Sequence, residues 1–316
     1  MKKTIDYKTF LAFAIIFITL SSCVNKNIET TTNETNTNIN TNNDTISENN
    51  IPTTSESANK ALESITNEQS VSDEKTSSEE YFNLAEKYVK GDGVKQDYQL
   101  AKENYEKSAN MGNAEAIERI GMLYHMGLGV NKDYRLAKEY YDKAAILGSS
   151  DAYYELGVLY ENGQGVDQNI QEAKKYYEIA AGMENKLALH NLGYLYLIGK
   201  GVNRDINKAI EYLNQAAIKE NPISLYCLGL IYDRGDGVAQ NYQLAKDYYE
   251  KAAALGNAES MCNLGIMYGA GNGVNKDFNI AKKYLNDAAT NGSARAQEIL
   301  TQLALADMME ANNQGK

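Results

Sequence analysis

The stretch that decides the fold is LGVLYENGQGVDQNIQEAKKYYEIAA, residues 156–181. Its tetrad Gly163-x-Gly165-Val166 is one of six that recur with a fixed stride of 36 residues. The six tetrads begin at Gly91, Gly127, Gly163, Gly199, Gly235 and Gly271. A fixed stride without insertions is typical of one supersecondary unit copied head to tail. Because one copy cannot bury its own apolar face, the sequence predicts that the copies stack into a solenoid.

Apolar residues recur at helical spacing within each copy. In the second copy, Ile117 and Ile120 predict a helix A over residues 114–126, and Tyr140 lies in a helix B predicted over residues 134–147. The first glycine of each tetrad should end helix A in a left-handed conformation. The second glycine should let the turn between the helices adopt a positive φ.

Capping residues agree with this division in every copy. An Asp or Asn that can cap helix B stands three residues after the tetrad's Val, at Asp97, Asp133, Asn169, Asp205, Asn241 and Asp277. The next helix has a similar cap at Asn113, Ser149, Asn185, Asn221, Asn257 and Ser293. Glycine fits the end of helix B at residues 112, 148, 256 and 292, whereas Glu184 and Glu220 hold this position in two copies. Those two turns should be tighter or strained.

The repeated pattern is specific enough to resemble a known family. Leu156-Gly157-x-x-Tyr160-x-x-Gly163-x-Gly165-Val166, followed by Ala173-x-x-Tyr176-Tyr177-x-x-Ala180-Ala181, is similar to the Sel1-like repeats, relatives of the tetratricopeptide repeats. The resemblance covers residues 81–292. It implies an all-α fold, a right-handed α/α solenoid of six 36-residue helix pairs with the A helices on the concave side. Residues 294–309 keep the phase without a further tetrad, so we expect a C-terminal capping helix there.

The N-terminus reads as an export signal. The apolar run Phe10–Leu20 is 11 residues long, which suits a signal peptide better than a spanning helix. It ends in Leu20-Ser21-Ser22-Cys23, which resembles the lipobox of bacterial lipoproteins. The resemblance implies cleavage before Cys23 and acylation of Cys23; the alternative is an ordinary secretory signal with a chance cysteine. Val24 in place of Asp favours the outer membrane over the inner one.

The sequence therefore divides into four expected regions. They are a signal peptide (residues 1–22), a lipidated cysteine with an Asn/Thr/Ser/Glu-rich tether (23–79), the repeats (80–292), and a capping helix with a tail (293–316). The tether has no aromatic residue or glycine and is predicted to be disordered, with a weak helix near Ala58–Ile65. The formal charge of −11 argues against nucleic acid as a partner, because nucleic-acid binding relies on clustered Lys and Arg.

Because the resemblance places the A helices on the inner wall, we expect a partner to bind there. The candidate groove consists of Tyr154, His190, Tyr194, Leu197, Tyr226 and Leu230. Carboxylates would rim it at Glu115, Glu118, Asp151, Glu161 and Glu259. Tyrosine offers large contact area at a low cost in side-chain entropy. The alternative is that these side chains only pack between adjacent A helices. Tyr124, Tyr160 and Tyr196 recur in every copy and are predicted to belong to the core.

Nothing in the sequence points to catalysis, a cofactor or a metal. The two histidines, His125 and His190, have no neighbouring Cys or His cluster. The tetrads follow helices and lack the Gly-Lys of a phosphate loop. Cys227 and Cys262 differ by one place in the repeat, so they should point about 100° apart on their helices. We therefore expect two separate buried thiols rather than a disulfide.

These features favour a non-enzymatic, membrane-anchored interaction scaffold that binds a protein or peptide in the concave groove. One alternative is a cell-wall ligand-binding or β-lactamase-like protein, by analogy with a cysteine-rich branch of the family whose cysteine pattern this chain lacks. Another is a surface-exposed protein with a role in host contact. A fold of this type supports many functions, so the partner cannot be derived from it.

Overall fold

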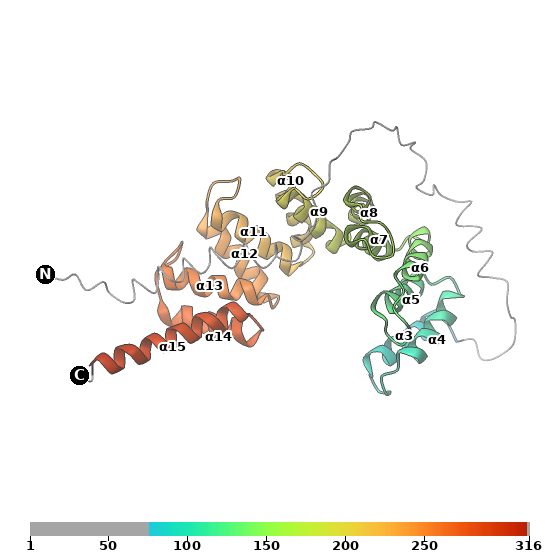
Figure 1. The fold of residues 1–316 in the computed structure, drawn as a ribbon, viewed down its shortest axis with the longest axis horizontal. Helices are drawn as coiled ribbons and strands as arrows, with labels where there is room; N and C mark the ends of the chain where they lie inside the picture. The colour runs from blue at the N-terminus through green and yellow to red at the C-terminus, as the bar shows by residue number, and fades with distance from the viewer. Residues whose placement is uncertain (1–75, 315–316) are drawn as a thin grey trace. The chain divides into compact units, whose positions relative to one another are not determined.

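The computed structural model describes residues 76–314, and this part of the chain contains helices and no strand (Figure 1). The expected signal peptide, Cys23 and nearly all of the expected tether lie outside the described residues. The described chain divides between Lys219 and Glu220 into two compact units, and each is described by itself. We call their described parts the N-terminal unit (residues 76–219) and the C-terminal unit (residues 220–314).

The helices come in antiparallel pairs, one pair for each tetrad. The N-terminal unit contains α3 (Ser78–Lys90), α4 (Tyr98–Ala109), α5 (Ala114–Met126), α6 (Tyr134–Ile146), α7 (Ser150–Asn162), α8 (Ile170–Gly182), α9 (Lys186–Ile198) and α10 (Ile206–Ile218). The C-terminal unit contains α11 (Pro222–Arg234), α12 (Tyr242–Ala254), α13 (Ala258–Ala270), α14 (Phe278–Thr290) and α15 (Ala294–Gln314). Odd numbers are A helices and even numbers are B helices. The helix pairs confirm the all-α repeat fold; α5 has the predicted bounds, α6 is one residue shorter, and α15 extends beyond residue 309.

Local signals place these boundaries. The predicted caps of the B helices accept bonds from first-turn backbone amides, as Asp133 does from Arg135 and Leu136 at 3.0 Å. The first glycine of every tetrad ends its A helix with φ between 67° and 84°. Glu184 and Glu220 also adopt positive φ, at 62° and 57°, and no other non-glycine residue in the described part does so. The strained turns predicted at these positions are therefore present.

The second glycine of each tetrad contributes to the turn and also, in the second, third, fourth and sixth repeats, contacts the preceding B helix. All six have φ between 66° and 74°. A Cβ on Gly129 would lie 2.7 Å from the Cβ of Tyr98, the first residue of the preceding B helix. On Gly165 it would lie 2.8 Å from the backbone of Tyr134. The tetrad is thus both a turn and the surface on which the previous repeat rests.

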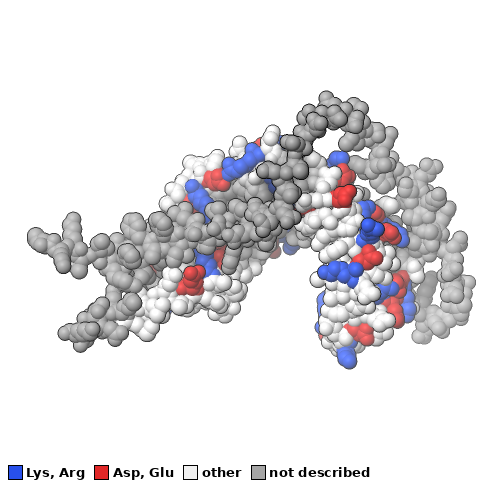
Figure 2. Space-filling model, in the orientation of Figure 1, with Lys and Arg blue, Asp and Glu red and all other residues white. Residues whose placement is uncertain are grey.

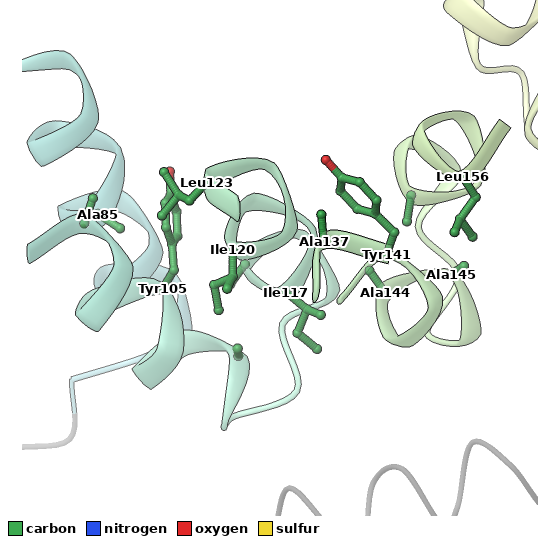
Figure 3. Packing of buried hydrophobic residues seen from close by; sticks show 14 of the residues in the cluster. Ala85, Tyr105, Ile117, Ile120, Leu123, Ala137, Tyr141, Ala144, Ala145 and Leu156 are labelled. Atoms are coloured by element: carbon green, nitrogen blue, oxygen red, sulfur yellow. The ribbon is translucent and has the colours of Figure 1, made fainter. Parts of the chain in front are cut away.

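The core of each repeat lies between its own A and B helices. A glycine in the middle of the A helix faces a large residue of the B helix in five repeats: Gly121 faces Tyr141, Gly157 faces Tyr177, Gly193 faces Leu213, Gly229 faces Tyr249 and Gly265 faces Leu285. The next repeat covers the other side of the B helix. Figure 3 shows this in the N-terminal unit, where Ile120 and Leu123 lie beside Tyr105.

The first repeat is adapted to being terminal. Glu80 and Lys87 stand where the second repeat has the buried Ala116 and Leu123. Leu84 is 37% exposed, whereas Ile120 at the same place in the second repeat is 1% exposed. A polar outer face is expected of a repeat that caps a solenoid. At the other end α15 packs on α14 through Ala296 and Ile299.

The two cysteines of the repeats have the arrangement that the sequence predicts. Cys227 and Cys262 are both buried and are not joined in a disulfide, as the repeat phase predicts. Burial raises the pKa of the Cys227 thiol to about 12, so it is protonated at neutral pH. In residues 76–314, none of the helices has the length and apolar character needed to cross a bilayer.

Candidate interaction face on the A helices

The predicted groove residues fall on A helices of both units. Tyr154 lies on α7, His190, Tyr194 and Leu197 lie on α9, and Tyr226 and Leu230 lie on α11. We call the side-chain surface of α3, α5, α7 and α9 the A face of the N-terminal unit. It holds the first four residues, and the other two belong to the C-terminal unit. All six side chains are partly exposed.

Two aromatic contacts involve the candidate groove residues, one between α7 and α8 and one within α9. The Tyr154 ring lies 5.8 Å from the ring of Tyr177, and its hydroxyl is hydrogen-bonded to Asn191 on α9. Burial raises the pKa of Tyr154. The rings of His190 and Tyr194 lie 6.4 Å apart and nearly parallel, at 22°. Burial lowers the pKa of His190 to about 4, so its imidazole is neutral at neutral pH. These residues therefore combine contact between A helices with partial exposure.

A pairing rule between the two helices of a repeat accounts for Leu197. In the second, third and fifth repeats, the hydroxyl of a buried B-helix tyrosine meets a polar group on the A helix four residues after the repeat glycine. The distances are 3.2 Å for Tyr141 and His125, 2.7 Å for Tyr177 and Glu161, and 3.2 Å for Tyr249 and Asp233. In the fourth repeat both positions are Leu, namely Leu197 and Leu213. At this position the A face is thus polar on α5 and α7 and apolar on α9.

A polar network joins the first three A helices. The Arg119 guanidinium on α5 lies 3.5 Å from Glu86 on α3, 3.1 Å from Glu118 and 3.2 Å from Glu115. The Tyr105 hydroxyl donates to the same Glu86 carboxylate. His125 Nδ1 on α5 lies 3.7 Å from Glu155 on α7. The network ties adjacent repeats together in addition to their apolar contacts.

The expected acidic rim needs correction. Glu118 is 2% exposed and lies under Arg119, so it is an interior residue rather than a rim residue. Glu161 accepts from Tyr177 and pairs with Lys200 at 2.9 Å. Glu115 and Asp151 remain at the surface.

Two carboxyl groups of this network have unusual proton affinity. Burial, with the nearby Asp151 carboxylate, raises the pKa of both Glu118 and Glu155 to about 7, and Arg119 opposes the shift. Burial also lowers the pKa of His125. Sequence reasoning missed Glu86, Arg119 and Glu155 as a group, because their proximity arises from neighbouring A helices about 36 residues apart in sequence.

The recurring tyrosines have the structural role predicted for them. Each of them stacks on a tyrosine in the B helix of its own repeat, with interplanar angles of 9–15°. The pairs are Tyr124 with Tyr140, Tyr160 with Tyr176, and Tyr196 with Tyr212. Tyr196 is buried, and the other two are half-buried. They therefore belong to the packing of each repeat.

In the C-terminal unit the candidate residues are packed among apolar groups. The Tyr226 ring lies 6.1 Å from that of Tyr249. Tyr226 and Leu230 both pack against the buried cluster that contains Tyr249 and Leu264. Glu259, another expected rim residue, lies 3.3 Å from Arg295 of α15. Within the described residues there is no group of three or more His, Cys, Asp or Glu side chains suited to a metal ion.

The Sel1 repeat profile matches six consecutive segments, residues 81–113, 114–149, 150–185, 186–221, 222–257 and 258–293. The chain belongs to the Sel1 repeat family. Sel1 repeat proteins are generally non-enzymatic scaffolds for protein–protein interaction. A comparison with curated proteins gives no match.

Solved Sel1 repeat structures share this architecture. A Sel1 repeat protein from Oxalobacter formigenes is 31% identical with a TM-score of 0.65, over 68% of this chain and 88% of that one. A protective antigen present in uropathogenic Escherichia coli strains is 28% identical with a TM-score of 0.52, over 72% of this chain and 57% of that one. The immunity protein PA5088 from Pseudomonas aeruginosa is 21% identical with a TM-score of 0.52, over 71% and 85%, and shows the shared fold alone.

Proposed function

We propose that this Sel1 repeat protein is a membrane-anchored scaffold that binds a protein or peptide partner on its A face. The observation that carries the proposal is the change in character at α9. There the repeat's polar pairing is replaced by Leu197 and Leu213, and His190, Tyr194 and Leu197 remain partly exposed. Partly buried aromatic and apolar side chains of this kind are typical anchors of protein interfaces.

The surroundings of α9 support a partner with both apolar and basic groups. Glu115 and Asp151 lie at the surface of α5 and α7, on the polar part of the A face. The charges elsewhere are mixed: on the side seen in Figure 2, Lys and Arg lie among Asp and Glu. An exposed carboxylate contributes mainly to the rate and specificity of association, so the apolar residues of α9 should supply most of the affinity.

The test is the double variant Tyr194→Ala, Leu197→Ala, compared with wild type by proximity labelling in the producing cells. Truncating two anchor side chains should lower recovery of the specific partners about tenfold or more. The matched control, Leu100→Ala with Ile218→Ala, removes exposed apolar side chains from B helices of the same unit and should leave recovery unchanged. Equal recovery from both variants, with equal thermal stability, would contradict binding at α9.

The anchor is proposed from the Cys23 signal in the sequence. Wild-type protein should sediment with membranes and partition into detergent, because acyl chains bury many methylene groups in the bilayer. Cys23→Ala should be recovered largely in the soluble fraction, whereas Val24→Ala should behave as wild type. Membrane association that survives Cys23→Ala would refute lipidation as the anchor.

Similarity to the protective antigen of uropathogenic E. coli favours a second candidate, exposure at the cell surface with a role in host contact. This second candidate concerns where the protein is located, and a scaffold could act at that location. Protease treatment of intact cells distinguishes a chain exposed at the cell surface from one enclosed by the envelope, because only the exposed chain would be degraded while the cells stay intact.

A further inference from the structure

The tetrad of the sixth repeat is the one tetrad in which an asparagine precedes the second glycine. In repeat order, the residue between the two tetrad glycines is Asp92, Leu128, Gln164, Lys200, Asp236 and Asn272. The backbone nitrogen of a residue after asparagine can attack the asparagine side-chain amide and close a five-membered imide. Glycine leaves this nitrogen unhindered, because it has no side chain. Two other Asn-Gly pairs occur in the chain, Asn162-Gly163 and Asn291-Gly292.

The reacting groups of Asn272 and Gly273 are not held by hydrogen bonds. Asn272 lies in the turn that follows α13, and its own backbone amide donates to the carbonyl of Met267 at 3.0 Å. Within residues 76–314, neither the side-chain amide of Asn272 nor the N–H of Gly273 has a hydrogen-bond partner. The Gly273 nitrogen can therefore attack the side-chain amide without first breaking a hydrogen bond.

The pair at the end of α7 is protected by its helix. Asn162 is the last helical residue, and the N–H of Gly163 donates to the carbonyl of Leu159. Because a helical Cα–Cβ bond tilts toward the start of its helix, the Asn162 side chain points away from the nitrogen that would attack it. Exposure alone would favour reaction here, since Asn162 is exposed and Asn272 is half-buried.

The pair after α14 is protected at both reacting groups. The side-chain amide of Asn291 donates to the carbonyl of Asp287 at 2.8 Å. The N–H of Gly292 donates to the carbonyl of Ala289 at 3.1 Å. Asn291 is exposed as well, so hydrogen bonding rather than exposure distinguishes Asn272 from the asparagines of the other two pairs.

We propose that Asn272 is a site of spontaneous deamidation, and that its isoaspartyl product weakens the packing of the sixth repeat on the fifth. The Gly273 nitrogen forms a bond to the side-chain carbonyl carbon of Asn272. Its proton passes to the amide nitrogen of Asn272, which leaves as ammonia. Water then opens the cyclic imide. Addition at the side-chain carbonyl gives aspartate, and addition at the main-chain carbonyl gives isoaspartate, whose backbone is longer by one methylene.

The two products differ in their effect on the repeat. Aspartate gives the tetrad Gly-Asp-Gly-Val, which the first and fifth repeats already have with Asp92 and Asp236. Isoaspartate displaces Gly273 instead, because it lengthens the backbone next to it. A Cβ on Gly273 would lie 2.5 Å from the Cβ of Tyr242, the first residue of α12, so the backbone has no room to move in that direction. Isoaspartate should therefore disrupt the contact between these two repeats, on which a solenoid depends.

The first experiment compares the three pairs in the folded and in the guanidinium-unfolded full chain, both incubated at mildly alkaline pH. The pairs lie on separate tryptic peptides, and deamidation raises the mass of each peptide by one unit. In the folded chain Asn272 should react first. Asn162 and Asn291 should react about fivefold or more slowly than in the unfolded chain, because a hydrogen bond must break first. Faster reaction of Asn162 or Asn291 than of Asn272 in the folded chain, or no reaction of Asn272, would overturn the proposed site.

Two variants test the effect on packing. Asn272→Gln copies the third repeat, and its longer side chain would have to close a less favourable six-membered ring. After incubation, wild type should accept methyl groups from an isoaspartate methyltransferase and unfold at a lower urea concentration, whereas Asn272→Gln should do neither. Fresh Asn272→Asp should unfold together with fresh wild type, which separates the added charge from the lengthened backbone. Incubated wild type that contains isoaspartate but unfolds at its original urea concentration would refute the effect on packing.

Discussion

Replacing Gly165 with alanine should destabilise the N-terminal unit by about 3–4 kcal/mol. The new Cβ would lie 2.8 Å from both the backbone carbon and the Cβ of Tyr134 in the preceding repeat, so it cannot be accommodated by moving one side chain. The backbone φ of 71° adds a cost of its own for any residue with a Cβ. Both costs act on the contact between repeats, on which a solenoid depends.

Gly93→Ala separates the two costs. Gly93 has nearly the same φ, 70°, but nothing lies within 4 Å of the place its Cβ would take. It should therefore lose only about 1–2 kcal/mol, the cost of the left-handed conformation. Urea unfolding measures both variants, with the m-value as a check that the same surface unfolds. Equal losses at Gly93 and Gly165 would show that the tetrad is only a turn and that repeats do not rest on it.

The comparison of Gly93 with Gly165 separates what the sequence predicts from what it does not. The stride, the caps and the two glycines of each tetrad predict the helix pairs, because each is a local property of the backbone. The contact between Gly165 and Tyr134 could not be predicted in the same way. It depends on how closely one repeat approaches the next, and the sequence records it only as a second invariant glycine.

The A face shows the same limit more sharply. Glu118 was expected at a rim because a carboxylate is usually exposed, yet it is buried beside Arg119. A signal was present: the same repeat position holds Tyr154, His190 and Cys262, which are large or apolar. Such residues indicate a position in contact with the neighbouring A helix rather than a fully exposed one. The identity of the compensating cation depends on the neighbouring helix, so sequence spacing alone did not identify it.

Between pH 8 and 6.5, Glu118 and Glu155 together should contribute about 1.5 kcal/mol of additional stability to the folded protein. Both carboxyls have a folded pKa of about 7, above the ordinary value of 4.5. The folded state therefore binds more protons than the unfolded state in this range. Stability consequently falls as the pH rises toward and through 7, and it is gained as the pH falls.

Two histidines oppose this contribution of the glutamates as the pH falls. The folded pKa of His190 is about 4, below its ordinary 6.5, so as the pH falls the unfolded state takes up that proton first and is half protonated at pH 6.5. Burial also lowers the pKa of His125, which acts in the same direction. Together the histidines therefore offset up to about 0.8 kcal/mol of the glutamate contribution between pH 8 and 6.5.

Glu118→Gln tests the assignment directly. The amide keeps an acceptor for Arg119 and removes the buried charge, so the variant should be more stable than wild type at pH 8 by about 2 kcal/mol. It should also remove the share of Glu118, about 0.8 kcal/mol, from the change in stability between pH 8 and 6.5. Glu115→Gln is the matched control: it also removes a partner of Arg119, but an exposed one, and should leave the pH dependence intact. Urea unfolding of wild type and both variants at pH 8 and 6.5 measures the stability difference at pH 8 and the pH dependence of each protein. A wild-type stability that is flat over this range, or a Glu118→Gln variant less stable than wild type at pH 8, would mean that Arg119 and its neighbours hold Glu118 fully ionised.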